Sequence, residues 1–175
     1  MRKKINNLIK HSFKESINLK SKILKSNLIS QIEKLATEVI VTLQNGGKVF
    51  FAGNGGSFAD SQHLAAEFVS KFLYNRKALP SIALGTNSSN ISAIGNDYDF
   101  KKVFSRELSA LASSKDIFIP ITTSGNSKNL IEAVKVAKKI KLKSVALTGK
   151  TGGKLSNLCE CIKVPSSSVP RIQEC

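Results

Sequence analysis

The chain has 175 residues, enough for a single domain with a hydrophobic core of ordinary size. No apolar stretch reaches the roughly 18 residues of a transmembrane helix, so we expect no membrane-spanning segment. The formal net charge is +15, but 23 of the 27 basic residues are lysine and tryptophan is absent. Specific nucleic-acid readers favour arginine and interleaved aromatic side chains, so we do not expect nucleic acid as a partner.

The first part of the chain, residues 1–45, predicts helix. Apolar residues recur at helical spacing from Ile5 to Ala36, and Gly46 and Gly47 end the pattern. This region is longer than one face of a small sheet requires, so we expect it to pack against a second subunit. The basic start of the chain is not followed by the apolar run of a secretory signal, and we expect a cytoplasmic protein.

Residues 46–175 predict an α/β core, without a linker that would divide the chain into two domains. Short apolar runs alternate with helical patterns, which indicates a parallel sheet covered on both faces. Ligands of such sheets bind beyond the carboxyl ends of the strands, where we also place residues 85–87, 95–97 and 148–150. The expected strands are residues 49–52, 81–84, 117–121, 144–147 and 161–164.

The first strand runs into Gly53, Asn54, Gly55, Gly56 and Ser57, and a helical pattern follows to about residue 72. Glycines let the backbone approach a ligand closely, and the free N–H groups of a helix start attract anions. The pattern therefore predicts a phosphate site. The alternative is plain helix capping.

The third strand repeats this arrangement with Thr122, Thr123, Ser124, Gly125 and Ser127 ahead of another helical pattern. A single hydroxyl is enough to cap a helix, so several hydroxyls in one loop favour phosphate binding over capping.

His63 and Glu67 lie four residues apart and therefore share one face of the first of these helices. A titratable pair beside a phosphate loop suits chemistry on a sugar phosphate, where a base removes a proton next to a carbonyl. The alternatives are a solvated glutamate and a packed histidine. We expect no role for His11.

The three cysteines lie late in the chain, at Cys159, Cys161 and Cys175. An odd number of cysteines does not match a disulfide framework, so we expect reduced thiols rather than a metal or redox motif.

Taken together, these motifs resemble the bacterial phosphoheptose isomerases, a branch of the sugar isomerase (SIS) domain. The resemblance covers essentially the whole chain in order. It rests on residues 53–57, Asp60, Gln62, His63, Glu67, and residues 95–97, 123–127, 147–149 and 171–174.

The resemblance implies a single SIS-type, flavodoxin-like domain. This is a three-layer αβα sandwich with a five-stranded parallel sheet and N-terminal helices, assembled as a homotetramer. It also implies conversion of sedoheptulose 7-phosphate into D-glycero-D-manno-heptose 7-phosphate, the first step towards the heptoses of lipopolysaccharide or related surface glycans. No nucleotide cofactor is implied.

Site residues follow from the same resemblance. Glu67 matches the acid/base residue, with His63 as its catalytic neighbour. Family members can carry zinc on positions similar to His63, Glu67 and Gln173, plus a histidine on a final helix. The substrate-binding positions are similar to Asn54, Gly55, Gly56, Ser57, Asp97, Thr122, Thr123, Ser124, Ser127 and Gln173.

The family's final helix and its histidine lie beyond the position of Cys175. Activity of these 175 residues is therefore open, and two non-catalytic alternatives stand beside the isomerase: a sugar-phosphate-sensing module and an adaptor that binds a replication initiator. Glu67 speaks against the adaptor, and a turnover measurement separates the sensor from the enzyme.

Overall fold

The computed structural model describes residues 1–175 and contains one five-stranded sheet in the order β2-β1-β3-β4-β5. All neighbouring strands run parallel. The predicted five-stranded α/β fold is confirmed, and each predicted strand is present to within one residue at either end. The strands are β1 (Val49–Ala52), β2 (Ser81–Ala83), β3 (Ile117–Thr122), β4 (Lys143–Thr148) and β5 (Glu160–Lys163).

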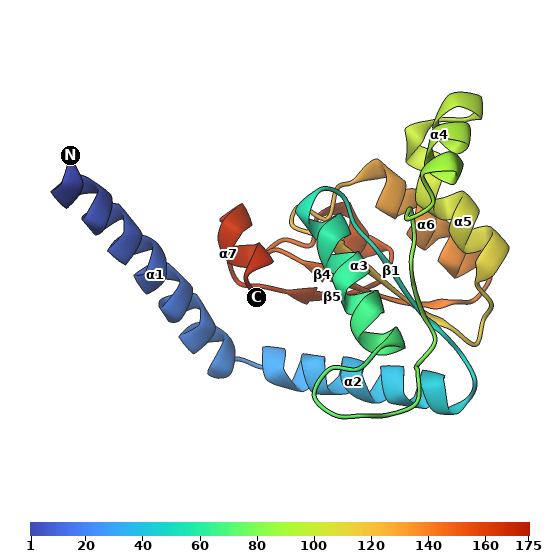
Figure 1. The fold of residues 1–175 in the computed structure, drawn as a ribbon, viewed down its shortest axis with the longest axis horizontal. Helices are drawn as coiled ribbons and strands as arrows, with labels where there is room; N and C mark the ends of the chain where they lie inside the picture. The colour runs from blue at the N-terminus through green and yellow to red at the C-terminus, as the bar shows by residue number, and fades with distance from the viewer.

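Helices cover both faces of the sheet (Figure 1). On β1, Phe50 packs with α5 and α6, whereas Val49 and Phe51 pack with α2 and α3, as strand alternation requires. The result is a three-layer sandwich. The helices are α1 (Arg2–Leu24), α2 (Leu28–Gln44), α3 (Gly56–Val69), α4 (Ser88–Asp97), α5 (Val103–Leu111), α6 (Lys128–Lys139) and α7 (Val169–Gln173), with 3₁₀ turns η1 (Phe100–Lys102) and η2 (Gly153–Asn157).

The long helical region at the start of the chain is two helices rather than one, because the helix breaks at residues 25–27. The hydroxyl of Ser26 donates to the carbonyl of Ile23 (2.8 Å) and accepts from the amide of Leu28 (3.2 Å). A serine side chain that bonds the local backbone competes with the helical hydrogen bonds. The chain therefore turns here, and α2 lies on the sheet while α1 does not.

Helix α1 projects away from the sandwich (Figure 1) and contacts α2 and α7. Its link to α7 is polar, because Arg171 donates to the carbonyl (2.7 Å) and hydroxyl (3.0 Å) of Ser12. Most of its apolar side chains are exposed: Ile5, Leu8, Ile9, Phe13, Ile17 and Leu24. None of the helices combines the length and hydrophobicity needed to span a membrane.

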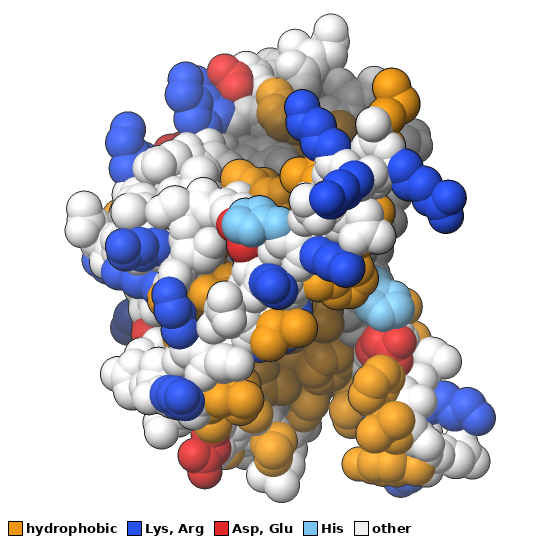
Figure 2. All heavy atoms as spheres, turned by 90° about the vertical axis from the view of Figure 1, so that its left-hand side faces the viewer, with side chains coloured by type: hydrophobic (Ala, Val, Ile, Leu, Met, Phe, Trp, Pro, Cys, Tyr) orange, Lys and Arg blue, Asp and Glu red, His pale blue; other side chains and the backbone are white.

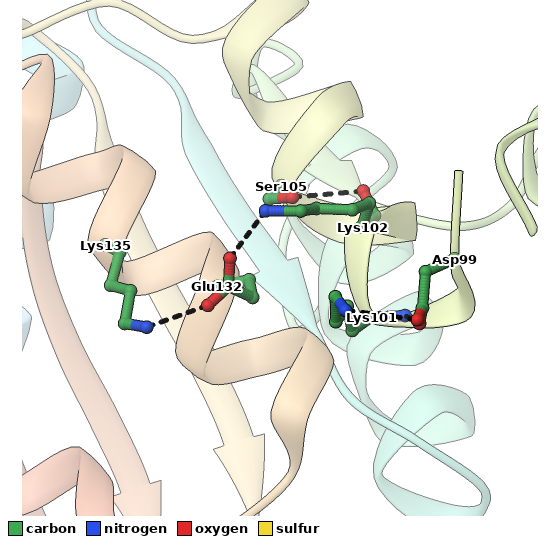
Figure 3. Close-up of polar contacts among 6 residues, drawn as sticks. All are labelled: Asp99, Lys101, Lys102, Ser105, Glu132 and Lys135. Atoms are coloured by element: carbon green, nitrogen blue, oxygen red, sulfur yellow. Dashed lines mark hydrogen bonds and ion pairs between the residues drawn. The ribbon is translucent and has the colours of Figure 1, made fainter.

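On the opposite side of the molecule, ion pairs brace α6 against η1 (Figure 3). Glu132 of α6 pairs with Lys102 (2.6 Å) and Lys135 (2.8 Å). Hydrogen bonds from these two lysines lower the pKa of Glu132 to about 2. The N-terminus of the same helix carries the second hydroxyl-rich loop.

Candidate active site

The two predicted phosphate loops follow β1 and β3, which are neighbours in the sheet. From β1 the chain crosses over to β2 on one side, and from β3 to β4 on the other, so the strand order reverses between these two strands. This is the place where open parallel sheets bind ligands. The N-termini of α3 and α6 begin at the same edge, so two positive helix-dipole ends serve one site.

In the first loop, Gly55 precedes α3 with φ of +57°, a conformation that favours glycine. Glycine is required at Gly56 for a different reason: a methyl group there would collide with the side-chain amide of Gln173. The amide of Gln173 thus lies against the start of α3. Ser57 follows in the first turn and is buried.

The second loop is held in shape by its own hydroxyls. Thr122 Oγ1 lies 3.3 Å from Ser127 Oγ and accepts from the amide of Gly125 at 3.3 Å. Ser124 Oγ accepts from the amide of Asn126 at 3.2 Å. Thr122 is buried and Ser124 exposed. The loop is therefore a formed turn of donors and acceptors.

A pair of amides joins the two loops. Asn54 donates to Asn129 at 3.0 Å, and Asn129 donates back to Asn54 at 2.8 Å. Asn129 is 4% exposed and sits in the first turn of α6. Sequence reasoning missed it, because nothing local distinguishes it from a solvated helix asparagine. Only the fold brings its partner, 75 residues away, within reach.

Below the loops lies a cavity of about 440 Å³. Apolar side chains of α1, α2, α3, β3, β4 and β5 line it together with polar ones, among them Ser57, Asp60, His63, Thr122, Thr123 and Gln173. Figure 2 shows hydrophobic side chains on this side of the molecule, some set back in a hollow, with many Lys and Arg side chains around them. Thr123 also lines a second cavity of about 290 Å³, together with Ser124 and Lys150.

His63 and Glu67 lie on the same face of α3, with Nε2 and Oε1 3.5 Å apart. Their side chains are 75% and 30% exposed, so this single chain does not enclose the pair. Arg76 donates to the carbonyl of Glu67 (2.6 Å) and to that of Phe68 (2.8 Å), which fixes the end of α3 behind them. A small movement of either side chain brings the pair into direct hydrogen-bond reach.

Residues 95–97 form the end of helix α4. Asn87 begins that helix by accepting from the amides of Ser89 (3.0 Å) and Asn90 (3.2 Å), so the helix extends through Gly95. Helix α4 packs on η1 and α5, and Asp97 does not line the cavity of its own chain.

The donor set for a metal is incomplete. His63 and Glu67 are two typical zinc ligands, and Gln173 offers an amide nearby. No group of three His, Cys, Asp or Glu side chains could hold a metal ion. Catalytic zinc sites keep three protein ligands of these kinds. The residues of this chain alone therefore do not fit a zinc ion.

Two braced loops at helix starts, with an acid/base pair along one of the helices, define a doubly wound α/β protein that binds a phosphorylated ligand. The profile of the SIS domain matches residues 12–149. The phosphoheptose isomerase of Aneurinibacillus thermoaerophilus is 51% identical over 97% of this chain and 87% of its own length. Phosphoheptose isomerase 2 of Campylobacter jejuni is 48% identical over 97% of this chain and 86% of its own length.

Solved structures agree. The phosphoheptose isomerase of Neisseria gonorrhoeae superimposes with a TM-score of 0.90 at 38% identity, over 97% of this chain and 91% of that one. The phosphoheptose isomerase of Francisella tularensis superimposes with a TM-score of 0.90 at 36% identity, over 96% of this chain and 90% of that one. The chain belongs to the SIS domain family and, within it, to the phosphoheptose isomerases.

Proposed function

We propose that the protein converts sedoheptulose 7-phosphate into D-glycero-D-manno-heptose 7-phosphate, which supplies heptose for lipopolysaccharide or other surface glycans. The observation that carries this proposal is the spacing along α3. Ser57 stands in the first turn, and His63 and Glu67 follow six and ten residues later, a rise of ~9 and ~15 Å. That span suits an open-chain sugar whose phosphate and carbonyl lie at opposite ends.

The phosphate binds at the two loops. Ser57, Thr122, Thr123, Ser124 and Ser127 donate hydroxyl hydrogens, and the amides of Gly55 and Gly56 face the same ligand at the start of α3. Asn54 reaches the sugar hydroxyls from its brace with Asn129. Thr122, Ser124, Ser127 and Asn54 are preorganised because each already takes part in a hydrogen bond of the loops, which reduces the ordering that binding requires.

Glu67 acts as the base. It removes a proton from C1 of the ketose, and the electron pair becomes the C1–C2 double bond of an enediolate. The same proton is then delivered to C2 while a proton passes from O1 to O2, so no net proton is gained or lost. His63, 3.5 Å from Glu67, is placed to carry the second transfer. Gln173 orients the substrate by its amide above Gly56.

Zinc at His63, Glu67 and Gln173 is left to experiment, because this chain offers only two typical zinc ligands and one side-chain amide. A bound zinc ion would polarise the carbonyl. Every step above uses only side chains of this chain. Titrating zinc into the metal-free protein, while following binding by calorimetry and turnover in parallel, tells whether the ion binds and whether it matters.

A homotetramer is part of the same proposal. The exposed apolar face of α1 would be covered by a second copy, and an incoming copy could enclose the open His63–Glu67 pair and bring an Asp97 to it. Phe13→Glu tests this, because a charge on that face should shift the mass seen by light scattering from tetramer to a smaller species. We place the protein in the cytoplasm, where its three free thiols stay reduced.

The deciding experiment follows the protein with sedoheptulose 7-phosphate by NMR and looks for the aldose. Unphosphorylated sedoheptulose and a five-carbon ketose phosphate serve as controls for the phosphate and the chain length. A protein that is stabilised against heat by the heptulose phosphate but never turns it over would be a sensor, and the isomerase proposal would fail.

A further inference from the structure

The two cysteines near β5 lie on the same side of the sheet. Cys159 sits in a bend just before the strand begins at Glu160, and Cys161 lies within the strand. Residues two apart in an extended chain point to the same face. Both Cys159 and Cys161 therefore pack, half-buried, against the core cluster that contains Phe118.

Their sulfur atoms share one small environment. Cys161 Sγ donates to the carbonyl of Cys159 itself at 3.6 Å, and Cys159 Sγ donates to the carbonyl of Leu155 at 3.7 Å. Two residues of extended chain span at most ~7 Å between the outer Cα atoms. Disulfides form with Cα atoms up to about 6.8 Å apart, which is close to this limit.

The two thiols differ in acidity. Hydrogen bonding from the Cys159 thiol, helped by the charge of Lys163, lowers the pKa of Cys161 despite its burial. Hydrogen bonding with Cys161, together with burial, raises the pKa of Cys159. One thiol is thus prepared to ionise beside another that keeps its proton, which is the arrangement of an attacking and a resolving cysteine.

We propose that Cys159 and Cys161 are a site of reversible oxidation by peroxides, closing to an intrachain disulfide that loosens the second phosphate loop. The Cys161 thiolate attacks one peroxide oxygen, forming an S–O bond as the O–O bond breaks and hydroxide leaves. Cys159 sulfur then attacks the sulfenic sulfur, giving the S–S bond and water. The thiols lose two electrons, which the peroxide gains, and a cellular dithiol restores them.

The link to the loop runs through η2. The amide of Leu155 donates to the carbonyl of Gly125 in the loop (3.1 Å), while the carbonyl of Leu155 accepts from the amide of Cys159 (3.0 Å). The neighbouring amide of Lys154 donates to Asn126 (3.0 Å). Drawing Cys159 towards Cys161 removes its thiol from Leu155 and pulls on the turn that supports Gly125.

The sequence offers a clean chemical readout. Trypsin cuts after Lys154 and Lys163, so both cysteines leave in one peptide, 155–163, while Cys175 leaves in another. After hydrogen peroxide and alkylation of free thiols, that peptide should have lost two hydrogens and carry no alkyl group. Dithiothreitol should reverse this. In Cys159→Ser, a sulfenic acid should instead accumulate at Cys161 and be trapped by dimedone.

The functional consequence rests on the proposed phosphate site and is measured in a Cys175→Ser background. Oxidation should raise KM for the sugar phosphate a few-fold, with a smaller change in kcat, and weaken binding of inorganic phosphate. Cys159→Ser/Cys161→Ser should show neither effect. If Cys175 of the unmodified chain oxidises while peptide 155–163 keeps two free thiols, or if the disulfide forms and phosphate affinity is unchanged, the proposal is wrong. A reduced protein without isomerase activity that still closes the disulfide would count against the proposed function alone.

Discussion

Strands β1 and β3 lie side by side, and their two ends are joined by different chemistry. At the amino ends, the buried carboxylate of Asp116 accepts from the amides of Lys48 and Ser113 at 2.7 Å each, and Lys48 Nζ lies 3.2 Å away. At the carboxyl ends, a neutral amide pair, Asn54 and Asn129, joins two loops above a cavity. At the amino ends the polar groups bond one another. At the carboxyl ends the polar groups hold two loops that can bind a ligand.

This contrast separates stability from activity along the same two strands. The bonds of Asp116 outweigh its burial and lower its pKa, so the charged carboxylate stabilises the fold. The carboxyl edge carries hydroxyl groups, such as that of exposed Ser124, which accepts a hydrogen bond within the loop and can still donate one to a ligand. Changes at the amino edge should therefore act on unfolding, and changes at the carboxyl edge on turnover.

The largest effect is expected at Glu67. Glu67→Gln keeps the shape of the side chain but removes the base, so turnover should fall by about 10²- to 10⁴-fold while substrate binding stays nearly unchanged. The chain contains its own control, since His11 and Glu15 on α1 form a pair with the same spacing, 3.6 Å apart. Glu15→Gln should leave turnover intact. A Glu67→Gln enzyme at wild-type rate would overturn the mechanism.

The next effect belongs to the amino edge. Asp116→Ala leaves the amides of Lys48 and Ser113 without their acceptor, and each unsatisfied buried donor costs about 1–3 kcal/mol. The free energy of unfolding in urea should fall accordingly, while KM and kcat of the folded fraction stay as they were. Asp116→Asn keeps one acceptor oxygen, so its free energy of unfolding should lie between those of Asp116→Ala and the wild-type protein. If Asp116→Ala instead kept its full stability and lost substrate affinity, the contrast between the two edges of the sheet would be wrong.

Asn129 tests whether the brace at the carboxyl edge is for stability or for function. In Asn129→Leu, the amide of Asn54 loses both its hydrogen bonds but is exposed to water, so we expect a loss of about 0.5–1.5 kcal/mol in stability and a higher KM as the first loop loosens. Asn7→Ala, on the exposed face of α1, is the matched control. A change in stability without any change in KM would show that the pair only holds the fold.

Much of this arrangement could be predicted from the sequence, because the signals are local. Alternation of strands and helices, the glycines before Ser57 and the hydroxyls around Ser124 gave the sheet, its order of elements and the two loops. What could not be predicted depends on partners distant in sequence or on a single competing side chain. Asn129 needs Asn54, and the break before α2 depends on Ser26.

Glu132 gives the smallest expected effect and lies at neither strand end. Its pKa is about 2 in the folded protein, against ~4.3 for an unfolded glutamate, because Lys102 and Lys135 favour the charged form. A carboxyl with a lowered pKa stabilises the fold above its unfolded pKa, and this contribution disappears as the pH falls towards 2. Since the pairs are near the surface, Glu132→Gln should cost less than ~1 kcal/mol at pH 7 and less still in high salt.

Urea unfolding of the wild-type protein and Glu132→Gln between pH 7 and pH 2 should show their stability difference shrinking through this window, with KM unchanged at neutral pH. A difference that stayed constant down to pH 2 would mean that the side chain acts by packing rather than by charge.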